Sequence, residues 1–503
     1  MRIIPTTMAT QHPDNASAPR WEENNDGFVS IAEEIRECEW CFSNLGTEEF
    51  MWDWEGKYAD EAVIDKLFEQ YYDYFKKHEL GRDIFLTFRL PNVWKEKGYS
   101  LLRALMVILT SEEFARDLKL HTPPLFEAIL PMTERAEQLI YIQDVFQKLA
   151  RFKMRTFTHS SHSHTDMIRM IPLVEGVLHQ LGIFSLLERY NLLYKRRFRS
   201  KLEYVRPFLA RSDPALASGL LATALANKLA LSEIRRFSEK YTVPCFPIIG
   251  VGSLPFRGGL SPDRLDSFML QNAGMRTVTI QSAFRYDFSE QAVARSIKLI
   301  HERLPMTESV AISQRHARII KRIVSSADAA YQKTLTRTLK TVDPFFSHVP
   351  RRRERRLHVG FLSYDRTMGT HSLPRAITFT AAFYSLGIPP ELIGLGKALA
   401  DMSSEERRVM ELYYPTVRED IMEAGRFLNR DNLARLASES AAWRGVARDI
   451  ERTEGLLGIT CAPGSANDSV HINLSSNMLL QKNDPVAVKA LITEMGILRK
   501  SLG

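Results

Sequence analysis

Short polar motifs follow the apolar runs of this sequence, and their side chains could do chemistry together. The chemically active residues in them are His12, Arg89, Glu175, Asp213 and Arg257. The motifs offer no reactive cysteine and no serine in a nucleophile turn, so covalent hydrolysis is not indicated. Carboxylates from two strands suit a hard divalent cation such as magnesium or manganese, and arginines suit phosphate and carboxylate groups. The motifs therefore predict metal-assisted chemistry on a small anionic substrate.

Eight apolar runs must position these motifs. They span residues 3–8, 84–88, 126–132, 168–174, 205–210, 245–249, 277–280 and 358–362. Polar and apolar residues do not alternate in these runs, which is typical of parallel strands buried on both faces of a sheet. The segments between the runs have helical periodicity. Eight such strands alternating with helices predict an α/β fold, a (β/α)8 TIM-like barrel whose chemistry sits at the carboxyl ends of the strands. A doubly wound open sheet is the alternative.

The remainder of the chain favours helices. From Ile377 to the end the pattern is almost purely helical, with helices expected at 405–413, 431–450 and 485–497. We therefore expect the barrel strands within about 1–366, a large helical part at 377–503 and a helix-rich molecule overall.

Composition and charge exclude several classes of protein. The 503 residues are 45% hydrophobic and 25% charged, which excludes disorder and coiled coil as the main state. With no run of eighteen apolar residues, no secretory signal and only four cysteines, we expect a cytoplasmic protein without a membrane partner. The net charge of +7 is concentrated in two clusters, 195–201 and 351–356, rather than in a general basic stripe. Such clusters suit the binding of small, multiply charged anions. A non-enzymatic protein that binds nucleic acid is the alternative from another class of function.

Three other patterns have ordinary interpretations. Cys38 and Cys41 form a CxxC inside an acidic, helical stretch, which favours two helix residues over a redox or zinc site. The histidines of the tract 158–164 precede a strand, which favours a solvated loop. The turn at 250–259 has only two glycines in G-x-G spacing, which fits a dinucleotide fingerprint poorly.

The motif Met8-Ala9-Thr10-Gln11-His12-Pro13-Asp14-Asn15 resembles the opening signature of the archaeal-type, or short-form, phosphoenolpyruvate carboxylases. The resemblance continues in order through the whole chain, in the motifs at 51–57, 88–92, 129–133, 171–175, 210–214, 255–259, 281–285, 351–356 and 499–503.

This resemblance implies one catalytic unit, 1–503, that condenses phosphoenolpyruvate with bicarbonate to oxaloacetate and inorganic phosphate. The family works with magnesium or manganese and without biotin, in anaplerotic carbon fixation that feeds the tricarboxylic acid cycle. Bicarbonate attacks phosphorus to give carboxyphosphate and a metal-bound enolate, and carboxyphosphate releases the carbon dioxide that the enolate attacks. The family forms homotetramers, built as dimers of dimers.

The resemblance also implies roles for residues of the matching motifs. Glu175 and Asp213 are similar to the two metal-binding carboxylates, and His12 to the histidine that takes the carboxyphosphate proton. Arg257 matches the arginine that handles bicarbonate and carboxyphosphate, and Arg89 one that stabilises the phosphoryl species.

Five further residues are expected to bind substrate. Arg375 matches an arginine that grips phosphoenolpyruvate, and either Arg352 or Arg353 is expected to be the second. Gln281 and Arg285 belong to the motif after the seventh run and are expected to contact the substrate as well.

The chain departs from the longer bacterial and plant form at several positions. That form has a lysine shortly after the metal-binding aspartate, where this chain has Leu216 and Ala217, and a His and an Arg where this chain has Ile249 and Val251. Anion binding must therefore be shared differently here. Another metal-dependent barrel enzyme of enolate chemistry, acting on pyruvate or phosphoenolpyruvate, is the alternative function.

Overall fold

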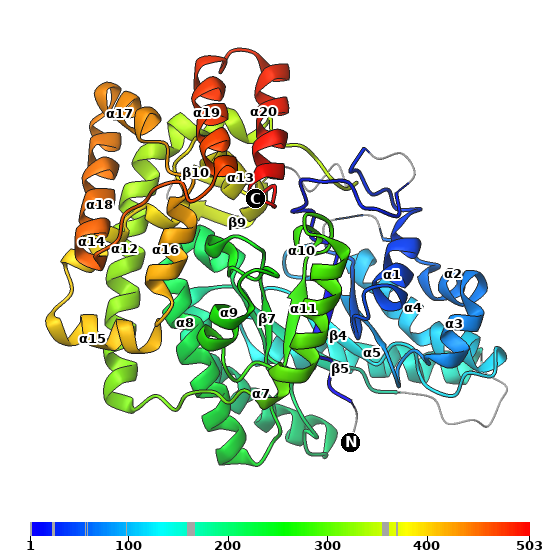
Figure 1. Cartoon of the computed structure of the whole chain (residues 1–503). Coiled ribbons are helices and arrows are strands. Elements are labelled where there is room, and N and C mark those ends of the chain that lie inside the picture. The colour runs from blue at the N-terminus through cyan, green and yellow to red at the C-terminus, as the bar shows by residue number, and fades with distance from the viewer. Residues whose placement is uncertain are drawn as a thin grey trace.

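Eight parallel strands close into a barrel at the centre of the molecule (Figure 1). The computed structural model describes residues 3–22, 26–55, 57, 59–96, 98–157, 166–354, 362–368 and 371–503. The strands are β1 (Thr7–Thr10), β2 (Glu49–Asp53), β3 (Phe85–Arg89), β4 (Glu127–Leu130), β5 (Arg169–Val174), β6 (Phe208–Ala210), β7 (Ile248–Gly250) and β8 (Thr277–Ile280). Each strand pairs with the next, and β8 pairs back onto β1. The predicted barrel is confirmed and the open sheet is excluded.

One predicted barrel strand is wrong. The barrel closes without the run at 358–362, whose last residue, Leu362, opens β9 (Leu362–Met368). Strand β9 pairs with β10 (His371–Pro374) in a separate two-stranded sheet, and residues 358–361 lie outside the described part of the chain. The missing barrel strand is β2, which begins and ends with a carboxylate. These two charges interrupt the apolar pattern expected of a buried strand, but both are compensated by arginines inside the fold.

The base of the barrel is filled by a buried ion cluster. Arg206 is fully buried and contacts Glu49 of β2 at 2.6 Å and Glu127 of β4 at 2.8 Å. Its Nη2 also donates to Oγ1 of Thr277 on β8, at 3.1 Å. Above this cluster the interior is apolar, with Met8, Met51, Ile129, Ile171, Leu173, Phe208, Ala210 and Ile248 packed together. The arginine therefore links three strands that are not neighbours in the sheet.

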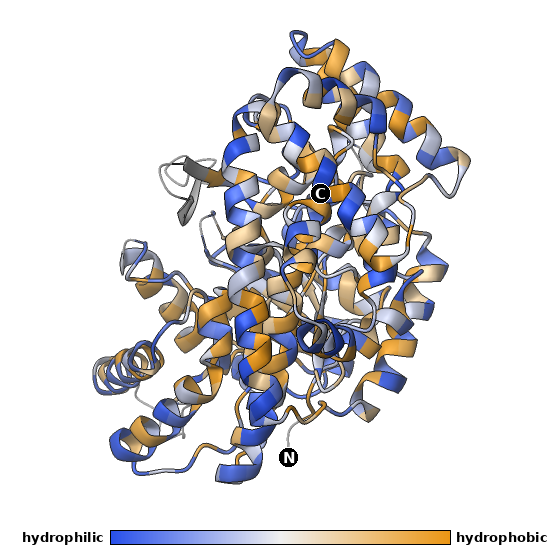
Figure 2. Ribbon diagram, turned by 90° about the vertical axis from the view of Figure 1, so that its left-hand side faces the viewer, coloured by the Kyte–Doolittle hydropathy of each residue, from blue (hydrophilic) through white to orange (hydrophobic). Residues whose placement is uncertain are grey.

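Helices surround the barrel with their apolar sides turned inward (Figure 2). They are α1 (Glu34–Ser43), α2 (Val63–Gln70), α3 (Tyr72–Lys77), α4 (Gly98–Asp117), α5 (Ala136–Thr156), α6 (Val177–Leu181), α7 (Ile183–Phe198), α8 (Ser212–Tyr241), α9 (Leu265–Gln271), α10 (Ser282–Tyr286) and α11 (Glu290–Arg303), with short 3-10 helices η1 (Pro255–Arg257) and η2 (Leu304–Met306). Cys38 and Cys41 are buried residues of α1, as the sequence favoured.

Helix α8 is the longest apolar helix of this layer. It is long and apolar enough to cross a membrane by composition, but 94% of its most apolar window is buried inside the molecule. The helix is interrupted at Gly219, whose φ of +80° favours glycine, and a Cβ there would lie 2.8 Å from the ring of Tyr331. This close approach lets α8 pack against α12 (Gln314–Phe346).

The predicted helical part follows the two-stranded sheet. It comprises α13 (Ala376–Ser385), η3 (Pro390–Leu392), α14 (Leu395–Ala400), α15 (Ser404–Tyr413), α16 (Val417–Gly425), α17 (Arg430–Glu439), α18 (Ala441–Leu457), α19 (Ala466–Leu480) and α20 (Pro485–Leu498). The expected helix 431–450 is in fact two, because Ser440 caps the start of α18 with its side chain. These helices lie to the left of and above the barrel in Figure 1, and share a core with α8 and α12.

Candidate active site

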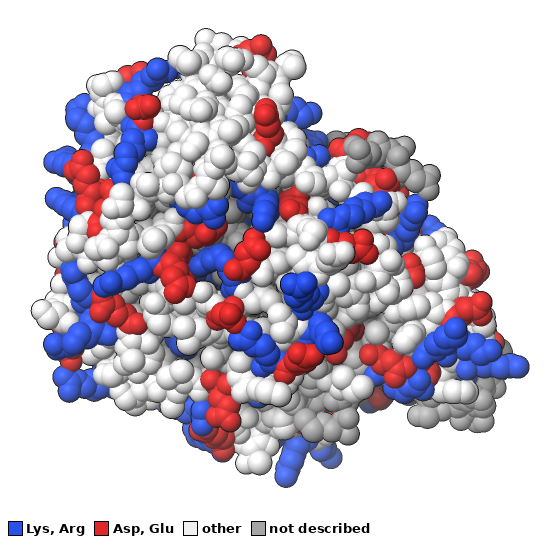
Figure 3. Space-filling view, viewed as in Figure 1, with Lys and Arg blue, Asp and Glu red and all other residues white. Residues whose placement is uncertain are grey.

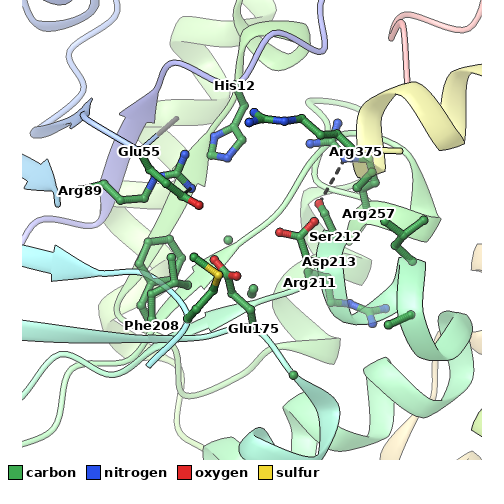
Figure 4. A pocket seen from close by; sticks show the side chains of 18 of the residues that line it. His12, Glu55, Arg89, Glu175, Phe208, Arg211, Ser212, Asp213, Arg257 and Arg375 are labelled. Atoms are coloured by element: carbon green, nitrogen blue, oxygen red, sulfur yellow. Dashed lines mark hydrogen bonds and ion pairs between the residues drawn. The ribbon is translucent and has the colours of Figure 1, made fainter. Parts of the chain in front are cut away.

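A cavity of about 390 Å³ lies at the carboxyl ends of the barrel strands (Figure 4). Seven of the predicted site residues line it, namely His12, Arg89, Glu175, Asp213, Arg257, Gln281 and Arg375. They follow different strands, as expected for a barrel enzyme, except Arg375, which enters from the segment that joins β10 to α13. The wall is therefore completed by the helical part of the chain.

Arg89 ends β3 and is held by two carboxylates. Its Nε and Nη2 donate to the two carboxylate oxygens of Asp53, at 2.9 and 2.5 Å, and its Nη1 lies 3.2 Å from Glu55. Burial alone would lower the pKa of Arg89, but the two carboxylates raise it overall. Burial raises the pKa of Glu55, while Arg89 lowers that of Asp53 against the opposing effect of burial. Arg89 is therefore a fixed cation on one side of the cavity.

His12 follows β1 and points into the cavity beside Arg89 and Arg375 (Figure 4). Its Nδ1 lies 2.9 Å from Oγ1 of Thr10. Burial lowers the pKa of His12 well below 6.5, and the charges of Arg89 and Arg257 lower it further. The imidazole is therefore neutral at neutral pH and can accept a proton.

Glu175 and Asp213 extend into the same part of the cavity (Figure 4). Glu175 directly follows β5, and Asp213 lies in the first turn of α8, after β6. No group of three His, Cys, Asp or Glu side chains in the described ranges is arranged around a common metal position. Magnesium needs no such group, since it commonly binds through one or two carboxylates, substrate oxygens and water. The pair therefore fits a magnesium or manganese ion that is completed by the substrate.

Arg257 lies in the glycine-rich turn after β7 and is 1% exposed. Its Nε donates to Ser212 Oγ at 3.2 Å, and its Nη2 donates to Gln281 Oε1 at 2.5 Å. Its Nη1 donates to Asp14 at 2.9 Å and to the backbone oxygen of Gly503 at 2.5 Å. Glycine is needed opposite, because a Cβ on Gly252 would lie 2.8 Å from the guanidinium carbon. These hydrogen bonds therefore fix the orientation of the guanidinium group.

Arg375 precedes the first turn of α13, and its guanidinium lies beside His12 in the cavity (Figure 4). Burial lowers the pKa of Arg375, and the charge of Glu55 opposes that effect. No ion pair of Arg375 is found among the described contacts, so its charge is balanced less directly than that of Arg89. An anionic ligand in the cavity would provide that balance.

Three predicted substrate ligands lie outside the cavity lining. Arg285 donates to Glu37 at 2.7 Å and to the backbone oxygens of Thr10 and Ile280, and it is fully buried. Arg353 also pairs with Glu37, and the two arginines lower the pKa of that carboxyl to about 2 against burial.

Arg352 is the third of these residues. It donates to the backbone oxygens of Asn15, Ala16 and Asp26, at 3.2, 2.5 and 3.3 Å. In this structure the three arginines therefore contact the loop after β1 and helix α1 outside the cavity. Among its described residues, the arginine cluster contributes no side chain to the cavity lining.

Several lining residues were not predicted. Asp53 and Glu55 stand in the motif 51–57, at the end of β2, and this strand has no clear apolar signal in the sequence. Lys95 and Arg211 also line the cavity. Arg211 directly precedes Ser212, so its place at a strand end was a usable signal, whereas Lys95 lies in a loop beyond Asn92 and carried none.

The chain is similar to known proteins along its length. A family model described as phosphoenolpyruvate carboxylase matches residues 4–503. A phosphoenolpyruvate carboxylase of Leuconostoc mesenteroides is 44% identical over 503 residues, which cover 100% of this chain and 99% of the relative. One of Oenococcus oeni is 42% identical over 504 residues, with the same coverage, and one of Metallosphaera sedula is 34% identical over the full length of both chains. Matched along its length by this family model and by these relatives, the chain belongs to the phosphoenolpyruvate carboxylase family.

Proposed function

We propose that this chain carboxylates phosphoenolpyruvate with bicarbonate in the cavity above the barrel, giving oxaloacetate and inorganic phosphate. The family membership supports the reaction, and the arrangement of the lining residues supports its place. A phosphorus–oxygen bond breaks and a carbon–carbon bond forms, with carboxyphosphate between the two steps. The reaction needs no biotin and serves anaplerotic supply of oxaloacetate.

Glu175 and Asp213 would hold the divalent cation, magnesium or manganese. The cation would supply positive charge that stabilises negative charge developing on the substrate. Arg375, on the opposite wall, binds the anionic groups of phosphoenolpyruvate in the ground state, because its charge faces the cavity without an ion pair among the described contacts.

Arg89 and Arg257 act on the migrating phosphoryl group and on carboxyphosphate. Protein acceptors fix both guanidinium groups before substrate binds. Donors that are already oriented stabilise developing negative charge well, because they need little rearrangement during the reaction. Arg285, Arg352 and Arg353 are then positioning residues behind the loop that carries His12.

His12 takes the proton of the carboxyphosphate carboxyl group. The neutral ring follows from burial and from the neighbouring arginines, which disfavour the charged imidazolium. Decarboxylation then gives carbon dioxide and phosphate beside the enolate, whose carbon attacks carbon dioxide.

A single observation carries the proposal: one cavity brings the carboxylates of Glu175 and Asp213 together with neutral His12 and with Arg89, Arg257 and Arg375. Oxaloacetate formation from phosphoenolpyruvate, followed through NADH oxidation by added malate dehydrogenase, tests it. We expect a rate that requires both bicarbonate and magnesium. Phosphate release that is independent of bicarbonate would favour the alternative class of enolate enzymes instead.

We also propose that residues 1–503 act as one catalytic unit, cytoplasmic and assembled as a homotetramer. The shared core of α8, α12 and the helical part supports a single unit. Lys and Arg are interspersed with Asp and Glu on the face shown in Figure 3, which does not favour a polyanion as partner on that face.

A further inference from the structure

Arg257 has five N–H groups, and four of them already have acceptors in the protein. Nε donates to Ser212, Nη1 donates to both Asp14 and Gly503, and Nη2 donates once to Gln281. Among the described contacts, one N–H of Nη2 is therefore left for a ligand. A group with so little freedom can act on the substrate only if its protein acceptors orient it correctly.

Asp14 is the acceptor that connects Arg257 with the rest of the site. It is fully buried, and its Oδ2 accepts from Arg257 at 2.9 Å. Its Oδ1 accepts from the backbone N–H of Ala283 at 2.7 Å, in the first turn of α10. Its backbone N–H donates to the oxygen of His12 at 3.1 Å, and its backbone oxygen accepts from Leu502 at 2.7 Å. Asp14 thus joins the base, the arginine, α10 and the segment 501–503.

The charge of Asp14 matters as much as its hydrogen bonds. It is the one carboxylate that forms an ion pair with Arg257 in the part of the chain that the structure describes. Both carboxylate oxygens face N–H donors. An amide in this place would present one NH2 group to a donor in either orientation, so either Arg257 or Ala283 would lose its acceptor.

We propose that Asp14 is a positioning residue that orients Arg257 toward the cavity and thereby sets the rate of the steps that Arg257 assists. The inference rests on the proposed function, because it assigns Asp14 to the bicarbonate and carboxyphosphate steps of that reaction. Asp14 does not line the cavity and acts only through Arg257.

A matched control is Asp287, which directly follows α10 and contacts the loop of Asp14. Its carboxylate accepts from the backbone N–H groups of Ala16 and Ser17, at 2.8 and 2.6 Å. It is half-buried and supports the same loop as Asp14, but it makes no contact with Arg257 among the described contacts. Asp287→Asn therefore perturbs the loop without removing the acceptor of the arginine.

The test compares Asp14→Asn, Asp287→Asn, Arg257→Ala and the double variant Asp14→Asn/Arg257→Ala, each measured at varied phosphoenolpyruvate and varied bicarbonate. We expect Asp14→Asn to lower kcat about tenfold to a hundredfold, the scale of a misplaced catalytic group. The KM for bicarbonate should rise while that for phosphoenolpyruvate changes less than about threefold. In the Arg257→Ala background the same substitution should change kcat less than about twofold, since it has nothing left to orient.

Three results would overturn the inference: equal losses from Asp14→Asn and Asp287→Asn, multiplicative losses in the double variant, or a rise confined to the KM for phosphoenolpyruvate. If Asp14→Asn does not fold by circular dichroism, Asp14→Ser replaces it in the same series with the same expectations. An inactive wild-type protein would instead refute the proposed function. Activity that requires Arg257 but not Asp14 would refute this inference alone.

Discussion

His12 lies among three arginines, and this environment decides which proton state the ring adopts. Burial is the largest cause of its lowered pKa, with Arg89, Arg257 and Arg375 adding to it and Asp53 opposing. A base that must accept a proton near neutral pH has to be unprotonated beforehand, so the cations that bind the substrate also prepare the base.

We expect the ring of His12 to stay neutral at pH 6.5, where an ordinary histidine is about half protonated. Because the folded protein disfavours the imidazolium, this residue stabilises the fold above pH 6.5, and that contribution is lost as the pH falls toward its own lower pKa. Histidine-labelled NMR between pH 8 and 5 measures it, with His12→Asn to assign the signal. A midpoint at or above 6.5 would contradict the prediction.

Glu175→Gln and Asp213→Asn should each abolish activity and leave the fold intact. The amide keeps the shape of the side chain but loses the charge that a divalent cation needs. Manganese binding by electron paramagnetic resonance should weaken in both variants, which separates loss of the cation from loss of a catalytic step. Near-normal turnover at saturating magnesium would remove that residue from the metal site.

Arg375→Ala and Arg257→Ala should affect different kinetic constants. Arg375 binds the ground state, so its loss should mainly raise the KM for phosphoenolpyruvate. Arg257 acts after the phosphoryl group begins to move, so its loss should lower kcat by about a hundredfold or more and raise the requirement for bicarbonate. Initial rates at varied concentrations of both substrates distinguish the two. The reverse pattern would mean that the two roles are exchanged.

The sequence predicts which residues line the cavity better than it predicts which residues a charged side chain contacts. His12, Glu175, Asp213, Arg257 and Arg375 stand in recognisable motifs, and all of them line the cavity. Arg285 and Arg353 stand in equally polar motifs, yet their charges are directed at Glu37, far along the chain from both. No local pattern shows where a long side chain finds its acceptor, so ligand and support could not be distinguished.

At the scale of elements, the barrel depends on a charge inside its base. Seven of the eight strands were predictable because they are apolar, and each overlaps its predicted run. Strand β2 was not, since the buried Glu49 and Asp53 are compensated by Arg206, which precedes β6, and by Arg89 of β3. Tertiary contacts thus override the local pattern at the one strand that carries buried carboxylates at both ends.

Arg206→Met should lower the free energy of unfolding by about 3–5 kcal/mol, because it leaves Glu49 and Glu127 buried without a cation. Urea denaturation measures the change. The triple variant with Glu49→Gln and Glu127→Gln should recover part of the loss. A single variant as stable as the wild type would show that the cluster contributes little.

At the scale of the whole molecule, an exposed apolar surface bears on assembly. Exposed apolar side chains such as Leu480, Val486 and Ile497 lie on α19 and α20 or at their ends, and a second copy could cover them. We expect a tetramer of about four times 57.6 kDa by light scattering at micromolar concentration. Val486→Glu should dissociate the assembly if this face forms a contact, and Leu102→Glu on α4 serves as the control. A monomeric wild-type protein would contradict the prediction.

The contact between Asp14 and the segment 501–503 also has a consequence for biosynthesis. Asp14 and Ser501 lie 487 positions apart, and a ribosome makes them in order. At roughly 5–20 residues per second, residues 281–503 emerge about 10–45 s after the last barrel strand. A nascent chain therefore lacks the acceptor of Arg257 at Gly503 until residue 503 has been made, and a product of interrupted translation would lack the contact that helps to hold this arginine.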